Sequence, residues 1–185
     1  MTTSSFDRNV FLIGPMGSGK SAVGRHLARL LHLEFYDSDA EIERRTGVDI
    51  PFIFEKEGEA GFREREREII DALTKLERTV IATGGGAILL PVNRACLASR
   101  GQVVYLKTGI GQQVERTRHG RQRPLLYTDD PEAKLRELMA LRAPLYESIA
   151  AVTVATDRRQ VRAVAEEIAQ TLAAWFPTEP PMTSR

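Results

Sequence analysis

A glycine-rich segment near the start of the chain carries the residues with the clearest chemistry. Residues 14–21, Gly-Pro-Met-Gly-Ser-Gly-Lys-Ser, match the pattern G-x-x-x-x-G-K-[ST]. In such a loop the backbone N–H groups surround phosphate oxygens, the lysine reaches the β- and γ-phosphates, and the serine hydroxyl can bind Mg²⁺. A glycine-rich turn with a solvated lysine is the alternative. The residues expected to bind nucleotide phosphates are Gly17, Ser18, Gly19, Lys20, Ser21 and Ala22.

Two aspartates, Asp37 and Asp39, come at the end of a second short apolar run. If that run is a strand of a parallel sheet, they lie at the edge where such sheets bind ligands, together with the phosphate loop. A carboxylate there can hold Mg²⁺ through water, or can accept a proton from a hydroxyl that attacks the γ-phosphate. The alternative is that they cap a helix that begins near Ala40.

Three glycines and one arginine extend this set. Gly84, Gly85 and Gly86 end a third apolar run, where missing side chains would let a ligand approach backbone N–H groups; a plain turn is the alternative. Arg63 opens a charged run but lies beside the apolar stripe of its helix, two turns before Ile70. We therefore expect Arg63 to reach a site, and its neighbours Glu64, Arg65 and Glu68 to face water.

Arginine recurs in the second half of the chain. Arg116, Arg118, Arg121 and Arg123 form a cluster with no acidic residue between them. Such a cluster could bind nucleic acid, but the near-neutral net charge and the phosphate loop favour a mobile lid over phosphates. Arg142, near the end of a long helix, could stabilise that helix end or bind a ligand.

The elements that must position these residues alternate along the chain, which predicts an α/β fold with right-handed crossovers. Continuous apolar runs predict buried parallel strands. They cover residues 10–13, 33–36, 79–83, 102–107 and 151–155. Helical spacing of apolar residues, with proline at several starts, predicts the helices. They are expected from Lys20 to about residue 31, from Pro51, after Gly58, and over 91–99, 111–118, 131–146 and 161–175.

The amino-acid composition excludes several classes of protein. The 185 residues suit one domain, and 26 Lys and Arg against 25 Asp and Glu leave a net charge of +1. With 42% apolar and 28% charged residues, the chain is neither disordered nor strongly basic. Cys96 is the single cysteine, so no internal disulfide forms. The longest uncharged stretch, 79–93, is too short and too interrupted to span a membrane. We expect a cytoplasmic protein without a secretory signal.

Together the motifs resemble those of the shikimate kinases. Arg63-x-x-Glu66-x-x-x-Ile70, followed after nine residues by Val80-Ile81-Ala82-x-Gly84-Gly85-Gly86-x-Ile88, is similar to that family's own signature, and the resemblance covers about residues 9 to 175. It implies ATP-dependent phosphorylation of the 3-hydroxyl of shikimate, in the route to chorismate and the aromatic amino acids. It also implies a three-layer αβα fold, similar to that of the nucleoside monophosphate kinases, with a five-stranded parallel sheet in the order 2-3-1-4-5.

The resemblance assigns roles residue by residue. Asp39 resembles the catalytic base that also binds the shikimate hydroxyls, and Asp37 resembles a water-mediated partner of Mg²⁺. Arg63 and Arg142 resemble the pair that binds the shikimate carboxylate, with Gly84, Gly85 and Gly86 beside them. The expected ATP contacts outside the phosphate loop are Arg116 and Arg159 near the adenine and Arg123 of the lid at the phosphates. Arg123 and Lys20 are also expected to be catalytic. Phe54 and Phe62 resemble walls of the substrate pocket.

The resulting expectation is one kinase domain over residues 9–176, with a substrate-binding segment at about 38–66 and a lid at about 116–130. Residues 1–8 are expected to form a flexible leader and 177–185 a disordered tail. We expect a monomer that binds ATP, shikimate and Mg²⁺, but neither nucleic acid nor membrane. The alternatives are a nucleoside monophosphate or gluconate kinase, and a GTPase-type switch module. The chain contains no Asp-x-x-Gly and no Asn-Lys-x-Asp, which disfavours the switch.

Overall fold

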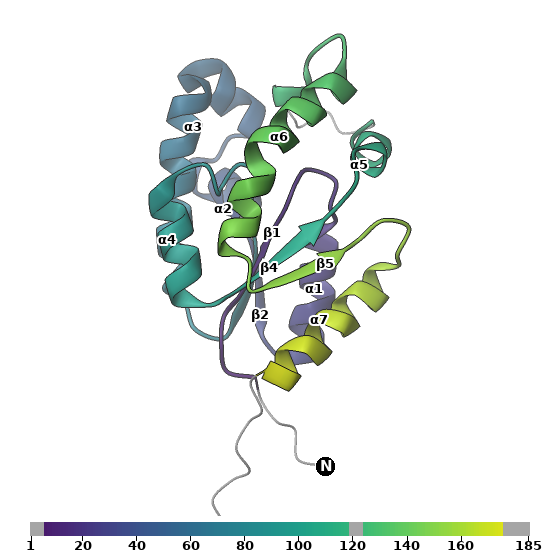
Figure 1. Ribbon diagram of the computed structural model, residues 1–185. Helices are drawn as coiled ribbons and strands as arrows, with labels where there is room; N and C mark the ends of the chain where they lie inside the picture. Colours follow the sequence, from purple (N-terminus) through teal and green to yellow (C-terminus); the bar gives the residue numbers. More distant parts are fainter. Residues whose placement is uncertain (1–5, 119–123, 176–185) are drawn as a thin grey trace, which may run out of the picture.

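Five parallel strands form one sheet in the order β2-β3-β1-β4-β5, as expected from the sequence. The computed structural model in Figure 1 describes residues 6–118 and 124–175. The strands are β1 (Val10–Ile13), β2 (Glu34–Asp37), β3 (Thr79–Ala82), β4 (Gln102–Lys107) and β5 (Val152–Ala155). Several expectations fall outside the described residues: the first five residues of the leader, the whole tail from 177, and Arg121 and Arg123 of the arginine cluster.

Alternation along the central strand β1 divides the core into two halves. Val10 and Leu12 belong to the apolar cluster on one face of the sheet, and Phe11 and Ile13 to the cluster on the other face. All four side chains are fully buried, since β1 lies between β3 and β4. A continuous apolar run therefore marks a strand that is covered on both faces.

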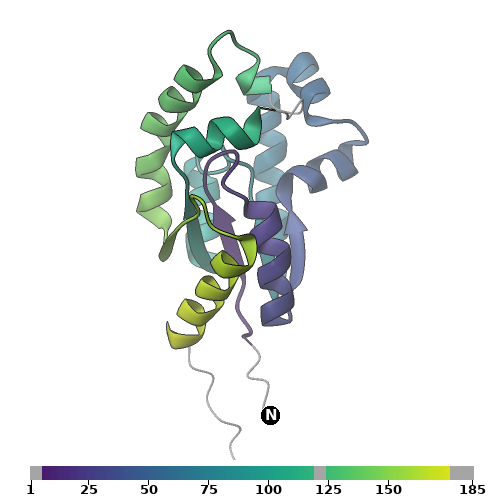
Figure 2. The same ribbon diagram turned by 90° about the vertical axis from the view of Figure 1, so that its right-hand side faces the viewer.

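Helices complete a three-layer arrangement, which Figures 1 and 2 show from two sides. Residues of α1 (Lys20–Leu31) and α7 (Val161–Trp175) fill the cluster on one face. Residues of α2 (Ser38–Thr46), α3 (Ile50–Thr74), α4 (Pro91–Arg100) and α6 (Pro131–Ile149) fill the other. Two shorter elements, α5 (Ile110–Thr117) and the 3₁₀ helix η1 (Pro124–Leu126), complete the described chain.

Local signals fix where α3 begins and bends. The Asp49 side chain accepts a hydrogen bond from the Phe52 N–H at 2.9 Å and thus caps the helix, whose first turn contains Pro51. Gly58 has φ 68°, a left-handed conformation that interrupts the helix. The two helical segments expected on either side of Gly58 are therefore two arms of one kinked helix.

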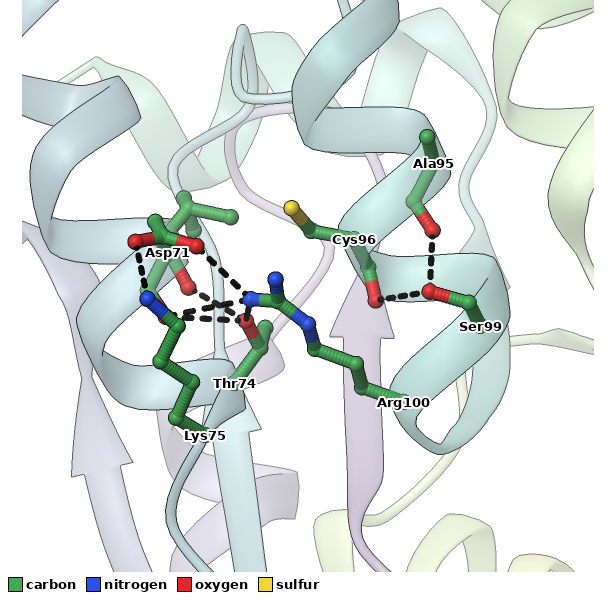
Figure 3. Close-up of polar contacts among 8 residues, drawn as sticks. Asp71, Thr74, Lys75, Ala95, Cys96, Ser99 and Arg100 are labelled. Atoms are coloured by element: carbon green, nitrogen blue, oxygen red, sulfur yellow. Dashed lines mark hydrogen bonds and ion pairs between the residues drawn. The ribbon is translucent and has the colours of Figure 1, made fainter.

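A polar contact ties the C-terminal part of α3 to α4, as Figure 3 shows. The Arg100 guanidinium on α4 donates to the Asp71 carboxylate at 2.9 Å and to the Thr74 hydroxyl at 2.8 Å. Lys75 pairs with the same carboxylate at 2.6 Å. This contact and the apolar cluster beneath it hold the second arm of α3, which carries Arg63 and Glu66, at a fixed position against the sheet.

The structure corrects the sequence analysis at one site residue. The second strand was expected at 33–36 and lies at Glu34–Asp37, so that Asp37 ends the strand but Asp39 lies in the first turn of α2. Other boundaries differ by at most three residues, at helix and strand ends, where the periodic pattern is weakest. Across residues 6–118 and 124–175, no helix combines the length and the apolar character that a bilayer crossing requires.

Candidate active site

The phosphate loop joins β1 to α1. Gly14, Gly17 and Gly19 have φ values of 146°, 75° and 90°, which side-chain-bearing residues rarely adopt. The Lys20 ammonium lies folded against the loop, donating to the Gly14 carbonyl at 2.8 Å and the Pro15 carbonyl at 2.7 Å. The glycines thus shape a turn whose N–H groups and lysine are gathered at the N-terminus of α1, an arrangement suited to an anion.

Asp37 connects this loop to the neighbouring strand. The Ser21 hydroxyl donates to Asp37 Oδ2 at 2.5 Å, and Asp37 Oδ1 accepts from the backbone N–H groups of Asp39 and Ala40 at 3.1 and 3.3 Å. Asp37 therefore caps α2, as the alternative interpretation had it, and also faces the loop. A hydroxyl and a carboxylate at one point are hard oxygen donors of the kind that Mg²⁺ accepts together with water.

Asp39 and Glu66 bring two carboxylates together. Asp39 Oδ1 and Glu66 Oε1 are buried and have no hydrogen-bond partner within the described residues. A Cβ atom built on Gly84 would lie 2.6 Å from the first oxygen and 2.7 Å from the second, so both converge on this glycine. Burial, followed by the negative charges of Glu66 and Asp37, raises the pKa of Asp39 to about 7. Such a carboxyl can accept or release a proton near neutral pH.

Lack of space for a Cβ atom explains why the turn after β3 consists of glycines. Neither Gly84, Gly85 nor Gly86 has the left-handed φ that would demand glycine. A Cβ on Gly84 would collide with the two carboxylates, and a Cβ on Gly86 would lie 2.5 Å from the central guanidinium carbon of Arg63. The turn is therefore glycine because charged side chains approach its backbone closely, as ligand-binding backbone also requires.

Two arginines from different helices face this turn. Arg63 on α3 is held by Glu66 at 2.6 Å and by Glu59 at 3.0 Å. Arg142 on α6 is 3% exposed, and its Nε has no partner among the described residues. Burial lowers the pKa of Arg142, and the positive charge of Arg63 acts in the same direction. Two guanidinium groups that line one pocket, of which Arg63 is half-buried and Arg142 buried, favour an anionic ligand there.

These residues line two adjoining pockets. The first combines both arginines and both carboxylates with apolar walls, including Phe54 and Phe62, whose ring centroids lie 4.8 Å apart. Its lining is Met16, Asp39, Ile50, Phe54, Phe62, Arg63, Glu66, Gly84, Gly85, Gly86, Pro124, Leu125 and Arg142. The second contains the phosphate loop, with Met16, Gly17, Gly19, Lys20, Ser21, Ala22, Asp37, Asp39, Thr83, Gly85 and Arg116. Asp39 borders both, so a group bound in one can meet a group bound in the other.

The expected adenine-side residues are less closely gathered. Arg116 at the end of α5 donates to the Gly17 carbonyl at 2.9 Å and lines the loop pocket. Arg159 follows β5, pairs with Glu167 at 2.5 Å and lines neither pocket. Arg123 lies outside the described residues, although Pro124 and Leu125, which follow it, line the first pocket.

Two residues of this region escaped the sequence analysis as functional candidates. Glu66 was part of the quoted signature but received no role; its position one helical turn after Arg63 was the available signal. Tyr146 lies one turn after Arg142, and its hydroxyl donates to the Gly85 carbonyl at 2.5 Å. Only the structure shows that contact, because the two residues are 61 positions apart.

Comparison with known proteins agrees with this geometry. A family model described as shikimate kinase matches residues 16–173. A shikimate kinase of Halorhodospira halophila is 58% identical over 88% of this chain and 92% of its own length. One of Thioalkalivibrio sulfidiphilus is 57% identical over 88% of this chain and 85% of its own length.

Solved structures give the same result. Shikimate kinase from Acinetobacter baumannii, in complex with shikimate, superposes with a TM-score of 0.91 at 50% identity, over 92% of this chain and 95% of that chain. The Aquifex aeolicus enzyme superposes with a TM-score of 0.76 at 36% identity, covering 90% and 96%. A gluconokinase from Sinorhizobium meliloti, at 20% identity and a TM-score of 0.55 over 92% and 94%, shares the fold alone.

Proposed function

The chain belongs to the shikimate kinase family, and we propose that it transfers the γ-phosphoryl group of ATP to the 3-hydroxyl of shikimate, giving shikimate 3-phosphate and ADP. The position of Asp39 carries the proposal for the mechanism, because this carboxylate borders both the phosphate-loop pocket and the pocket with the two arginines. An acceptor hydroxyl and a γ-phosphate can therefore meet beside one ionisable group.

We assign the acceptor to the pocket that holds Arg63 and Arg142. Their planar guanidinium groups match a carboxylate, and burial in an apolar-walled pocket strengthens that pairing. The N–H groups of Gly85 and Gly86, which have no hydrogen-bond partner within residues 6–118 and 124–175, add uncharged donors. Asp39 then accepts hydrogen bonds from the shikimate hydroxyls, and the aromatic pair of Phe54 and Phe62 forms the apolar wall.

In the chemical step, the 3-hydroxyl oxygen attacks the γ-phosphorus and its proton passes to the Asp39 carboxylate. The new oxygen–phosphorus bond forms as the bond from the γ-phosphorus to the bridging oxygen breaks, and ADP leaves with that electron pair. A base with a pKa of about 7 is ionised in about half of the molecules at neutral pH. Asp39 is thus suited both to take the proton and to release it afterwards.

The donor binds along the phosphate loop, Gly17 to Ala22, where Lys20 balances charge at the β- and γ-phosphates. Mg²⁺, when bound, neutralises the phosphate oxygens; Ser21 would hold it directly and Asp37 through water, which their shared oxygen site supports. We assign Arg116 and Arg159 to the adenine side and Arg123 to the phosphates, in a lid at about 116–130. Pro124 and Leu125 in the wall of the acceptor pocket support the lid.

We further propose a single kinase domain over residues 9–176 that acts as a monomer in the cytoplasm and binds no nucleic acid. The described residues from Asn9 to Trp175 surround one sheet, and residues of this one chain line both pockets. A net charge of +1 gives no basic surplus for nucleic acid. The substrate-binding segment at 38–66 contributes Asp39, Phe54 and Arg63 to the acceptor pocket.

A coupled assay of ADP release tests the reaction. With ATP and Mg²⁺, we expect release that depends on shikimate, and none above background with gluconate or a nucleoside monophosphate as acceptor. Release that proceeds equally without shikimate, or that prefers another acceptor, would overturn the proposed activity. Omission of Mg²⁺ in the same assay should abolish release, which tests the metal separately.

A further inference from the structure

The turn after β3 contains a peptide group whose orientation the turn itself does not fix. The Ala87 N–H bonds to the Gly84 carbonyl at 3.1 Å, and the Leu89 N–H bonds to the Gly86 carbonyl at 2.9 Å. The first contact closes a β-turn from Gly84 to Ala87 in which the Gly85–Gly86 peptide is the central one, and the second closes the turn that follows it. Flipping that peptide converts one common turn type into another, and the flipped form requires positive φ at the third residue. That residue is Gly86, so the flip meets no side-chain barrier.

Tyr146 holds this peptide in one orientation. Its hydroxyl donates to the Gly85 carbonyl at 2.5 Å, and its side chain is fully buried in α6. Burial raises the pKa of the Tyr146 phenol well above its ordinary value, so it remains a donor at physiological pH. In a trans peptide the carbonyl and the N–H point in opposite directions. The Gly86 N–H therefore points away from Tyr146, and no hydrogen-bond partner for it occurs within the described residues.

The tyrosine ring is itself fixed. It stacks on Tyr105 of β4, with ring centroids 5.0 Å apart and planes inclined by 21°. The Tyr105 hydroxyl is also buried but has no partner in the described part of the chain. The pair thus consists of two stacked phenols, of which only the Tyr146 hydroxyl bonds to the turn.

We propose that Tyr146 is a positioning residue for the acceptor: it orients the Gly85–Gly86 peptide so that the Gly86 N–H donates to the shikimate carboxylate beside Arg63 and Arg142. The inference rests on the proposed function and assigns a role to a residue outside the pocket lining. Its support is the turn geometry, the hydroxyl contact, and the close approach of Arg63 to Gly86.

The substitution Tyr146→Phe removes the hydroxyl and keeps the stacked ring, and Tyr105→Phe is the matched control. In Tyr146→Phe we expect the Michaelis and dissociation constants for shikimate to rise about five- to tenfold, the loss of one hydrogen bond. The Michaelis constant for ATP should stay within about twofold, which also verifies the fold. In Tyr105→Phe all of these constants should match those of the parent, because no contact is lost.

A substrate analogue separates positioning from general damage. The methyl ester of shikimate lacks the anionic carboxylate, so Tyr146→Phe should weaken its binding by less than about twofold. Equal weakening of shikimate and its ester, or an unchanged shikimate constant in Tyr146→Phe, would overturn the inference while leaving shikimate-dependent ADP release intact. Release independent of shikimate in the parent protein would instead overturn the proposed function, and the inference with it.

Discussion

At the scale of single residues, the site depends on how charges are arranged around Asp39. Its Oδ1 faces a second carboxylate, Glu66, which in turn is paired with Arg63. Removing water from a carboxylate disfavours its ionised form, and a neighbouring negative charge adds to this effect. The pKa of Asp39 is therefore set by burial, by the negative charge of Glu66, which is distant in sequence, and by that of the neighbouring Asp37.

The first prediction concerns the pH dependence of turnover. Because the pKa of Asp39 is raised to about 7, kcat/KM for shikimate should rise with pH and level off above that value. Glu66→Gln removes a negative charge and should move the rising limb to lower pH. Initial rates measured from about pH 5 to 9 test both statements. A limb that stays in place in Glu66→Gln would contradict the assigned coupling.

The second prediction separates the two aspartates by their response to Mg²⁺. Asp39→Asn removes the base, and turnover should fall by about 100-fold or more at any Mg²⁺ concentration. Asp37→Asn weakens a metal partner, so its loss should be partly restored by excess Mg²⁺ through mass action. Rates titrated with Mg²⁺ decide the matter. Rescue of Asp39→Asn alone would reverse the two roles.

At the scale of elements, the sequence analysis worked best where one pattern decides the structure. The buried run of β1 and the amphipathic helix α7 have the expected bounds, Val10–Ile13 and Val161–Trp175. Asp39 was expected at a strand end, but the cap formed by Asp37 starts α2 at Ser38, two residues before the start considered near Ala40, and Asp39 lies close to Gly84. The strand ends and the helix begins at adjacent residues, Asp37 and Ser38, and the periodicity of apolar residues cannot locate such a boundary.

No local sequence pattern predicts contacts between segments that are distant along the chain. The glycines after β3 were expected to let a ligand approach the backbone, and this stays a prediction. The structure shows charged side chains of α2 and α3 close to Gly84 and Gly86. The Tyr146 contact with Gly85 joins α6 to the same turn. Such contacts depend on how the helices pack on the sheet. In the sequence, only the signature quoted for the family indicated that these segments share a site.

The third prediction concerns the segment Pro124–Asp130, which contains η1 and leads into α6. Pro124 and Leu125 line the acceptor pocket, whereas Tyr127 is 64% exposed. A segment with few buried contacts opens readily, and ligands beneath it should stabilise it. Amide hydrogen exchange in this segment should slow when ADP and shikimate are added together, relative to ADP alone. Identical exchange in the free and bound protein would argue against a lid.

At the scale of the whole molecule, strand order explains why the two pockets adjoin. β1 lies between β3 and β4, and it pairs with β3 from Val10 opposite Val80 to Leu12 opposite Ala82. The phosphate loop and the glycine turn, which follow these strands, therefore emerge side by side at one edge of the sheet. A parallel sheet places ligand sites at that edge, and helices from both halves of the chain close it.

The fourth prediction links the site to global stability. The unfolded carboxyl of Asp39 has a pKa near 3.8 and the folded one about 7, so between these pH values the folded state keeps a proton that the unfolded state loses. This contribution is complete below the lower value and is lost as pH rises through the upper one. At pH 8, Asp39→Asn should therefore be more stable than the parent by roughly 2–4 kcal/mol.

Chemical denaturation of the parent and Asp39→Asn across about pH 4 to 8 measures this difference. The gap should nearly close toward pH 4, where the parent carboxyl is protonated in the folded state and close to half protonated in the unfolded state. Asp129→Asn, at an exposed position, controls for the loss of one surface carboxylate. A constant gap at all pH values would show that the titration of Asp39 is not its source.

The contact between Gly86 and Arg63 also bears on how this enzyme could be inhibited. A side chain at position 86 would collide with the guanidinium of Arg63, so a substitution made to exclude an inhibitor would also displace the arginine that we propose binds the shikimate carboxylate. For an anionic inhibitor bound against this turn, a substitution here that prevents its binding would thus also reduce the activity of the enzyme. Escape would have to come from residues at the pocket rim, such as Ile50 or Leu125, whose replacement leaves the charged groups in place.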